Sequence, residues 1–272
     1  MGREAERARA RASVLAVLEQ RHGVGGRGGH VPAWILARVD SALDALCPSS
    51  GDGLGLAAQK LCEDGAELER LAELLRVGET HFYRDAVAWD ALRAALLPSF
   101  AGRDRVRAVS AGCSTGEEAW TLAMLVAEAC AASRRQPAWR VVGMDRSEVA
   151  LATAREGAYS SEAARHLPAD LRARYLSQEG DGVRMVDALR DRVSFVVRDL
   201  LQGPPPGSYE LVICKNVLIY LGEQAGRRAV DGLRRSLAPG GALIVARSEV
   251  PRLRAMGHSG EEIAPGVTVF RG

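Results

Sequence analysis

The sequence predicts an α/β protein with a doubly wound, mostly parallel sheet that follows a small all-α N-terminal domain. From Val106 onward, short apolar or β-branched segments alternate with segments of helical periodicity, as in a parallel sheet covered on both faces. Before Val106, apolar residues recur at helical spacing only. After the first predicted strand, Gly112 and Gly116 bracket a tight turn that opens a helix. Small residues there let backbone N–H groups approach a ligand, and the helix dipole favours an anion.

Residues 1–85 are expected to form the helical domain and its linker. Its apolar stripes, such as the leucines near the end of the last helix, predict helices at 3–21, 32–46, 54–63 and 65–76. The connector 23–29 is rich in glycine but lacks the Gly-Lys-Ser/Thr ending of a phosphate loop, so we interpret it as a flexible turn. Residues 77–85 then break the helical pattern before a helix predicted at 86–97.

Residues 86–272 are expected to form the sheet domain, with a less regular inserted subdomain near 158–192. Strands are predicted at 106–109, 139–145, 183–186, 193–197, 209–214 and 242–246, with a final edge strand at 267–270. A helix is predicted after the glycine turn, where Leu122, Leu125 and Val126 fall at helical spacing, and further helices are predicted at 148–156, 169–177 and 223–237.

Composition excludes several classes of function. The 272 residues are 47% apolar and 26% charged, and the net charge of +2 is no nucleic-acid signature. The five cysteines form no CxxC pair and the five histidines are dispersed, which predicts neither disulfides nor a metal site. No apolar run reaches the roughly 20 residues that a membrane span needs. The arginine-rich start lacks the apolar core of a signal peptide, so we expect a cytoplasmic protein.

Three chemistries compete for the glycine turn. Residues 112–116 match the Gly-x-Ser-x-Gly elbow of hydrolases, with Ser114 followed by Asp199 and His258 in the right chain order. An elbow, however, follows strands that supply the oxyanion loop, and only helices precede this one. A dinucleotide oxidoreductase is disfavoured because the turn lacks Gly-x-Gly-x-x-Gly spacing. Asp145 also comes 33 residues after Gly112, later than the expected interval of about 20.

The third chemistry is methyl transfer from S-adenosylmethionine. Its ribose hydroxyls require an acceptor such as Asp145, which ends a predicted strand. Its methionine end carries an ammonium that the acidic residues Glu117 and Glu118 can meet. The same two glutamates would also compensate the dipole of the helix that they begin.

Four segments resemble the chemotaxis-receptor glutamate methyltransferases, the CheR type, in the same order and spacing. They are Gly78-Glu-Thr-His-Phe-Tyr-Arg84, Ser110-Ala-Gly-Cys-Ser-Thr-Gly-Glu-Glu118, Leu211-Val-Ile-Cys-Lys-Asn-Val-Leu-Ile-Tyr220 and Ala246-Arg-Ser-Glu249. The resemblance covers nearly the whole chain. It implies a Rossmann-like class I S-adenosylmethionine methyltransferase fold behind the helical domain.

The resemblance also implies roles for individual residues. Arg84, near the reacting end, and Tyr220 match active-site residues. The positions that match cofactor-binding residues or form the turn are Thr80, Arg84, Gly112, Gly116, Glu118, Asp145, Asp199, Leu200, Lys215 and Asn216. The sequence departs from the family at four positions: Gly78 and Asp199 replace asparagine, Lys215 replaces arginine, and Arg247 lies in a stretch that usually reads Gly-His-Ser-Glu.

The implied activity is a protein-glutamate O-methyltransferase that uses S-adenosylmethionine, releases S-adenosylhomocysteine and needs no metal. The implied partner is an acidic helical sensory receptor at the membrane, with no nucleic acid involved. The arginines from Arg3 through Arg38 offer a basic face for it, and residues 158–192 lie where the family can dock a receptor tail. A catalytically impaired scaffold and a small-molecule methyltransferase remain as alternatives.

Overall fold

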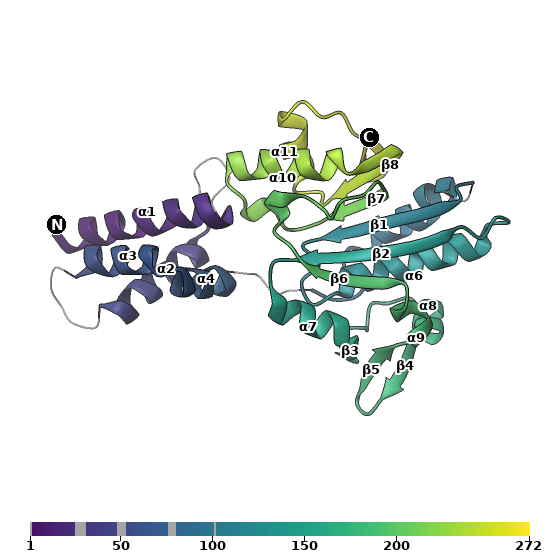
Figure 1. Cartoon of the computed structure of the whole chain (residues 1–272), viewed down its shortest axis with the longest axis horizontal. Coiled ribbons are helices and arrows are strands. Elements are labelled where there is room, and N and C mark those ends of the chain that lie inside the picture. The colour runs from purple at the N-terminus through teal and green to yellow at the C-terminus, as the bar shows by residue number, and fades with distance from the viewer. Residues whose placement is uncertain (1, 25–30, 48–52, 76–79, 101) are drawn as a thin grey trace. The chain divides into compact units, whose positions relative to one another are not determined.

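The computed structural model describes residues 2–24, 31–47, 53–75, 80–100 and 102–272, apart from the side chains of residues 2, 3 and 96. The chain divides into two compact units. The first is Met1–Val77 with Leu218–Arg228, and the second is Gly78–Val217 with Ala229–Gly272. Figure 1 shows the elements of both units along the chain.

The first unit contains four helices around an aliphatic core. They are α1 (Gly2–His22), α2 (Ala33–Leu46), α3 (Leu54–Glu63) and α4 (Gly65–Leu74). Leu18, Leu43 and Leu68 are among the core side chains that are fully buried. Asp64 caps α4 by accepting hydrogen bonds from the N–H groups of Ala66 and Glu67. The predicted helices of this unit are therefore confirmed, while most of the predicted connector at 23–29 lies outside the described residues.

A later segment of the chain completes the first unit. Leu221 forms an antiparallel bridge with Val24, and the N–H of Gly222 donates to the carbonyl of Gly23 at 3.1 Å. The ring of Tyr220 meets Trp34 edge-on, with the centroids 6.0 Å apart. Residues 218–222 are thus held by the helical unit although they follow a strand of the other.

The second unit is built on a seven-stranded sheet of order β6-β2-β1-β7-β8-β10-β9. The strands are β1 (Arg105–Ala111), β2 (Ala138–Asp145), β6 (Val193–Val197), β7 (Tyr209–Cys214), β8 (Leu237–Val245), β9 (Glu261–Ala264) and β10 (Val267–Arg271). The first five pair in parallel and the last two antiparallel. The predicted doubly wound, mostly parallel sheet is confirmed.

The direction of winding reverses at the centre of this sheet. From β1 the chain moves outward through β2 to β6, then returns to place β7 on the other side of β1 (Figure 1). In open α/β sheets, ligands bind at the carboxyl ends of the strands beside such a switch point. The glycine turn after β1 and the loop after β7 both lie there.

Helices and short helical turns connect these strands. They are α5 (Ala86–Ala91), η1 (Leu92–Leu96), η2 (Leu97–Phe100), α6 (Glu117–Ala132), α7 (Glu148–Glu156), α8 (Ala169–Tyr175), α9 (Asp187–Arg190), η3 (Leu200–Gln202), η4 (Leu218–Tyr220), α10 (Glu223–Arg235) and α11 (Val250–Ala255). Helix α6 packs against β1 and β2, and α7 against β2 and β6. No helix in the described part of the chain is both long and apolar enough to cross a bilayer.

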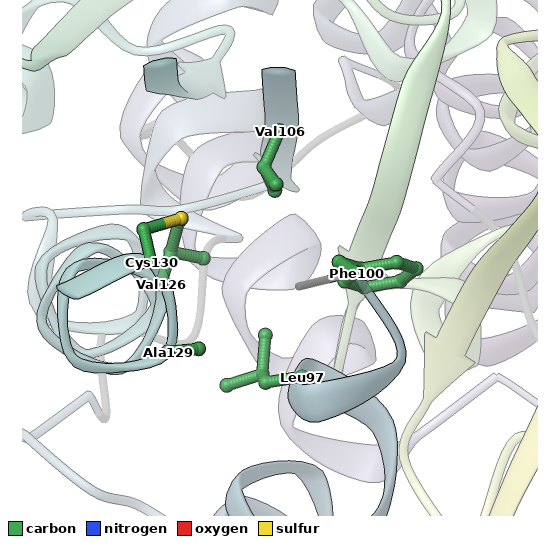
Figure 2. A pocket seen from close by; sticks show the side chains of 6 residues that line it. All are labelled: Leu97, Phe100, Val106, Val126, Ala129 and Cys130. Carbon is green, nitrogen blue, oxygen red and sulfur yellow. The ribbon is translucent and has the colours of Figure 1, made fainter. Parts of the chain in front are cut away.

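The single helix predicted at 86–97 is wrong in its second half. After Ala91 the chain forms the π turn η1 and then the 3₁₀ turn η2. Pro98 explains the change, because it has no N–H to donate and its ring clashes with the carbonyl of the preceding turn. The resulting turn points Leu97 and Phe100 towards Val106 of β1 (Figure 2).

These side chains close the core rather than open a ligand site. The apolar gap between them has no room for a water molecule. Its lining is made by Leu97, Phe100, Val106, Val126, Ala129 and Cys130 (Figure 2).

One predicted helix and one predicted strand need correction. The predicted helix at 169–177 ends at Tyr175, and the next residues form β4 (Leu176–Glu179) in a small antiparallel sheet of order β3-β5-β4. The other strands of that sheet are β3 (Ala158–Ser160) and β5 (Gly182–Met185). The predicted edge strand at 267–270 is instead interior, because β9 pairs outside it. Three strands were therefore not predicted, namely β3, β4 and β9. Of these, β4 and β9 carry charged, exposed residues, which are typical of sheet edges and hide the apolar alternation.

Candidate functional site

The turn after β1 requires glycine at both of its ends. Gly112 and Gly116 have φ of +80° and +98°. A Cβ at Gly112 would lie 2.5 Å from Cγ2 of Val217, and one at Gly116 would lie 2.7 Å from Cβ of Ala154. Between them Ser114 is also left-handed, with φ of 51°. The turn is therefore a tightly constrained loop, as the spacing of its glycines predicted.

Asp145, at the end of β2, fixes this turn. Asp145 is 7% exposed, and its carboxylate accepts from the N–H of Ser114 at 2.8 Å and from the N–H of Ser147 at 3.1 Å. Its carbonyl accepts from the N–H of Arg198 at 2.8 Å, which joins the end of β6 to the same place. These backbone bonds hold the carboxylate against the glycine turn, at the carboxyl end of β2.

Glu118, in the first turn of α6, provides a second carboxylate. It is partly buried, and its Oε1 accepts from the hydroxyl of Ser110 at 2.7 Å. Burial raises the pKa of Glu118 to about 7, although the positive charges of Lys215 and Arg84 and the bond from Ser110 lower it, while Glu249 raises it further. A cationic ligand group beside this carboxyl would favour its ionised form.

Arg84 lies between two residues with unusual backbone conformations. Tyr83 and Asp85 have φ of 59° and 66°. The carbonyl of Arg84 accepts from the indole N–H of Trp89 at 2.9 Å and from Nζ of Lys215 at 3.2 Å. Nζ of Lys215 also lies 3.0 Å from Oδ2 of Asp85. Two of the predicted site residues, Arg84 and Lys215, are thus brought together directly.

Thr80 reaches the same turn through Glu117. The buried carboxylate of Glu117 accepts from the hydroxyl of Thr115 at 2.7 Å and is also hydrogen-bonded by Thr80. Burial raises the pKa of Glu117, and these hydroxyls lower it. The hydroxyl of Tyr159 donates to the carbonyl of Thr115 at 2.7 Å. Sequence reasoning missed Tyr159, which gave no motif signal.

Asn216 begins the loop after β7 with φ of 61°. The carboxylate of Glu249, only 1% exposed, accepts from the N–H groups of Asn216 at 3.1 Å, Val217 at 2.9 Å and Ala246 at 2.9 Å. Sequence reasoning quoted Glu249 only as part of a motif. Its place shortly after the apolar strand β8 is the one feature of the sequence that could have pointed to it, and its partners became known only from the structure.

Asp199 and Leu200 open the turn η3 after β6. Oδ1 of Asp199 accepts from the N–H of Leu201 at 2.7 Å, so this side chain caps its own turn, and Leu200 is buried. Arg146, which sequence reasoning also missed, directly follows Asp145. Its Nη2 is buried and has no hydrogen-bond partner within the described ranges.

Tyr220 belongs to the first compact unit, where it packs on Trp34. Gly78 lies outside the described residues, and Arg247 is exposed beside Gly266. Across the described chain, no group of three or more His, Cys, Asp or Glu side chains is arranged to hold a metal ion.

The structure gives no support to a hydrolase that uses Ser114 with Asp199 and His258. Asp199 caps η3, and His258 lines a hollow with Arg234 and Glu261. Neither Asp199 nor His258 belongs to the turn that carries Ser114. The strand β1 is also the first of the large sheet, as the sequence predicted.

Comparisons with known proteins agree on one family. The family model for the CheR methyltransferase, SAM binding domain, matches residues 78–258. Chemotaxis protein methyltransferase 1 of Pseudomonas aeruginosa is 31% identical over 221 residues, which are 78% of this chain and 81% of that protein. The probable biofilm formation methyltransferase WspC of Pseudomonas putida is 32% identical over 229 residues, which are 80% of this chain and 53% of WspC. An uncharacterized 104.1 kDa protein of Rhodobacter capsulatus is 30% identical over 193 residues, 70% of this chain and 20% of that protein. The chain therefore spans about half of the length of WspC and about a fifth of the Rhodobacter protein.

Proposed function

The chain belongs to the CheR methyltransferase family, and from that premise we propose that it methylates glutamate side chains of a chemoreceptor-like sensory protein. The methyl donor is S-adenosylmethionine and the product is a glutamyl methyl ester. Residues 86–272 would carry the catalytic site, and residues 1–85 would dock the substrate. We place this activity in the cytoplasm, at the membrane-bound receptor.

The observation that carries the proposal is the position of two carboxylates on one glycine turn. Asp145 binds the turn through Ser114, and Glu118 stands on the helix that the turn begins. Both lie at the carboxyl ends of adjacent strands beside the switch point. An acceptor for ribose hydroxyls and a carboxylate whose ionisation a cation would favour fit a nucleoside that carries an ammonium.

The remaining residues fit the same ligand. Gly112 and Gly116 would let backbone N–H groups approach its carboxylate, near the positive end of α6. Leu200, next to Asp199, would contact the adenosine. The family resemblance implies that Thr80 and Arg84 contact the cofactor, with Arg84 near the reacting end, and that Lys215 and Asn216 occupy the positions of an Arg-Asn pair.

The proposed mechanism needs no general base. Bound S-adenosylmethionine supplies an electrophilic methyl group on a positively charged sulfur. A glutamate acceptor has an ordinary pKa of about 4.3 and is already ionised at neutral pH. The protein's tasks are therefore to align the acceptor and to exclude water, which solvates the separated charges better than the transition state. Arg84 and Tyr220 would orient the acceptor carboxylate or the methionine end without moving a proton.

Fewer arginines are available for docking than the sequence indicated, because two of them are paired within the helical unit. Arg7 and Arg11 form ion pairs with Asp44 and Asp40, at 2.6 and 2.9 Å, within the helical unit. The side chain of Arg3 lies outside the described residues. The docking charge must then come from exposed arginines such as Arg9 on α1.

A base-release assay tests the proposal. The protein is incubated with methyl-labelled S-adenosylmethionine and membranes containing a methyl-accepting receptor, and the protein fraction is then made alkaline. Carboxyl methyl esters release labelled methanol, whereas methylamines and ethers do not. Asp145→Ala is the matched control, and it should lose the release.

Each alternative predicts a different result of the same assay. A scaffold would bind S-adenosylhomocysteine in calorimetry but give no transfer. A small-molecule methyltransferase would place the label in the soluble fraction rather than on protein. Labelling of Ser114 by a fluorophosphonate would instead support a hydrolase.

A further inference from the structure

Lys215 has a buried ammonium that is committed to one segment of the chain. Its side chain is 4% exposed, and Nζ lies 3.0 Å from Oδ2 of Asp85 and 3.2 Å from the carbonyl oxygen of Arg84. Nζ also lies 5.2 Å from the centre of the Trp89 ring, whose face attracts a cation. A buried ammonium is costly unless its N–H groups are used. These contacts indicate that Lys215 holds the segment of residues 84–89 in place.

The segment that Lys215 contacts would not keep its conformation unaided. Left-handed conformations at non-glycine residues persist only where the surroundings hold them, and Tyr83 and Asp85 both adopt one. Tyr83 is held by its N–H, which donates to Oγ1 of Thr121 at 3.2 Å, and by its hydroxyl, which donates to Asp90 at 2.7 Å. Asp85 is held through its carboxylate by Lys215.

Arg84 lies between these two anchored residues, so its backbone is fixed on both sides. Its carbonyl is held by Trp89 from α5 and by Lys215 from the end of β7. Lys215 therefore ties the segment of Arg84 to the central sheet, at the strand end where the turn of Gly112 also lies.

We infer that Lys215 is a positioning residue for methyl transfer, which acts by holding the backbone of Arg84 so that the guanidinium is aimed into the cofactor site. This inference rests on the proposed function, because the role of Arg84 is part of it. The family resemblance implied that Lys215 binds the cofactor, and this inference assigns it a positioning role instead. In this role Lys215 acts through the backbone of Arg84 and needs no contact of its own with the cofactor or the acceptor.

The charges around Glu118 agree with this arrangement. Lys215 and Arg84 both lower the pKa of Glu118, and Glu249 raises it. A variant that removes the charge of Lys215 would therefore also raise the pKa of Glu118. Cofactor affinity must then be compared at about pH 8.5, well above the pKa of about 7, to separate this effect from positioning.

The experiment compares Lys215→Met with Lys215→Arg in the full chain. Three quantities are measured: calorimetric affinity for S-adenosylhomocysteine, kcat on a purified cytoplasmic receptor fragment, and hydrogen exchange of the amides of residues 83–89. We expect Lys215→Met to lower kcat about tenfold or more, since a small misplacement of a positioning group has effects of that size. Affinity should stay within about threefold, and exchange at 83–89 should accelerate. Lys215→Arg, which keeps the charge and the donors, should restore all three.

Two further variants make the result specific. Asp85→Asn disrupts the same ion pair from its exposed side, 44% accessible, and should lower kcat in the same direction even if Lys215→Met folds poorly. When Lys215→Met is added to Arg84→Ala, kcat should fall by less than about twofold relative to Arg84→Ala alone, because the two residues act as a unit.

The inference is overturned if Lys215→Met weakens S-adenosylhomocysteine binding as much as it lowers kcat while exchange at 83–89 is unchanged. It is also overturned if the effects of Lys215→Met and Arg84→Ala on kcat multiply. If the wild-type protein binds S-adenosylhomocysteine but esterifies no receptor, the proposed function fails. The exchange and affinity measurements then still decide whether Lys215 holds the segment or the cofactor.

Discussion

The backbone N–H of Ser114 donates a 2.8 Å hydrogen bond to Oδ2 of Asp145. This bond joins the strained turn after β1 to the strand-end carboxylate of β2, which are separated by 31 residues in the chain. The carboxylate proposed to bind the ribose therefore also keeps Ser114 in its left-handed conformation. A change at Asp145 must act on the turn and on the cofactor together.

Replacement of Asp145 by alanine should lower both cofactor affinity and stability. It removes the acceptor of two buried or partly buried N–H groups, those of Ser114 and Ser147, which costs about 1–3 kcal/mol in the free energy of unfolding. Affinity for S-adenosylhomocysteine should fall about tenfold or more, the effect expected for losing a hydrogen bond to a charged group. Calorimetry and chemical denaturation measure the two effects. Normal affinity in this variant would exclude Asp145 from the cofactor site.

The affinity for S-adenosylhomocysteine should rise with pH because of Glu118, whose pKa is about 7. The ligand's ammonium favours the ionised carboxylate, so affinity should increase about tenfold between roughly pH 6 and pH 8. Glu118→Gln should flatten this dependence and weaken binding at the higher pH. Calorimetry at several pH values tests it, and an equally steep rise in the variant would assign the titration to another group.

Glu118 should also affect the pH dependence of stability in the ligand-free protein. Its pKa is raised from 4.5 to about 7, so the folded state favours the protonated form. That contribution is fully present below the ordinary pKa and is lost as the pH rises through about 7. Denaturation curves of the wild type and of Glu118→Gln should therefore diverge across this interval, and parallel curves would contradict the raised pKa.

Gly116→Ala should destabilise the protein and weaken the site. Its φ of +98° is strained for alanine, and the added Cβ would lie 2.7 Å from Cβ of Ala154 and 2.9 Å from the hydroxyl of Tyr159. A loss of about 1–3 kcal/mol in the free energy of unfolding is expected from strain and overpacking. Gly55→Ala in α3 is the matched control, since nothing lies within 4 Å of its added Cβ. The control should be neutral or stabilising by up to about 1 kcal/mol.

Glu249→Gln should loosen the loop after β7. The amide group would place donors against backbone N–H groups that now share one buried carboxylate, those of Asn216, Val217 and Ala246. We expect a loss of about 1–3 kcal/mol in stability and faster hydrogen exchange at these amides. Unchanged exchange would mean that the loop is held by other contacts.

Charge reversal on the exposed face of α1 should weaken receptor docking. Arg9→Glu is expected to raise KM for the receptor fragment at low salt, and high salt should reduce the difference because it screens exposed charges. Arg7→Gln is the control, since Arg7 is already paired with Asp44 inside the helical unit. Equal effects of the two variants would indicate that α1 acts through its folding rather than through a docking contact.

Most regular elements could be predicted because their signal is local. Helical periodicity identified α1 to α4, and apolar runs identified β6 and β7 with their observed bounds. Predictions failed where a neighbour in space or a single residue decided the outcome. Pro98 ended the helix after α5, and β9 is recognisable as a strand only through its pairing with β10.

The site divides in the same way. The glycine turn and the strand-end position of Asp145 follow from spacing along the chain, and the resemblance of four segments indicated the remaining site residues. The order of strands, however, decides which of these residues touch. Glu249 was identified as the anchor of the loop at Asn216 only from the structure, since 33 residues separate them.

By itself, then, the sequence determined the type of each unit, the strained turn and the family, because backbone propensity, periodicity and glycine spacing act over a few residues. The tertiary structure alone decided that Lys215 donates a hydrogen bond to the carbonyl of Arg84, from which it is separated by 131 residues, and that burial raises the pKa of Glu118. Reversal of winding between β1 and β7 brings such distant segments to one edge of the sheet. Burial there, where charges lose their water, sets how those side chains pair and ionise.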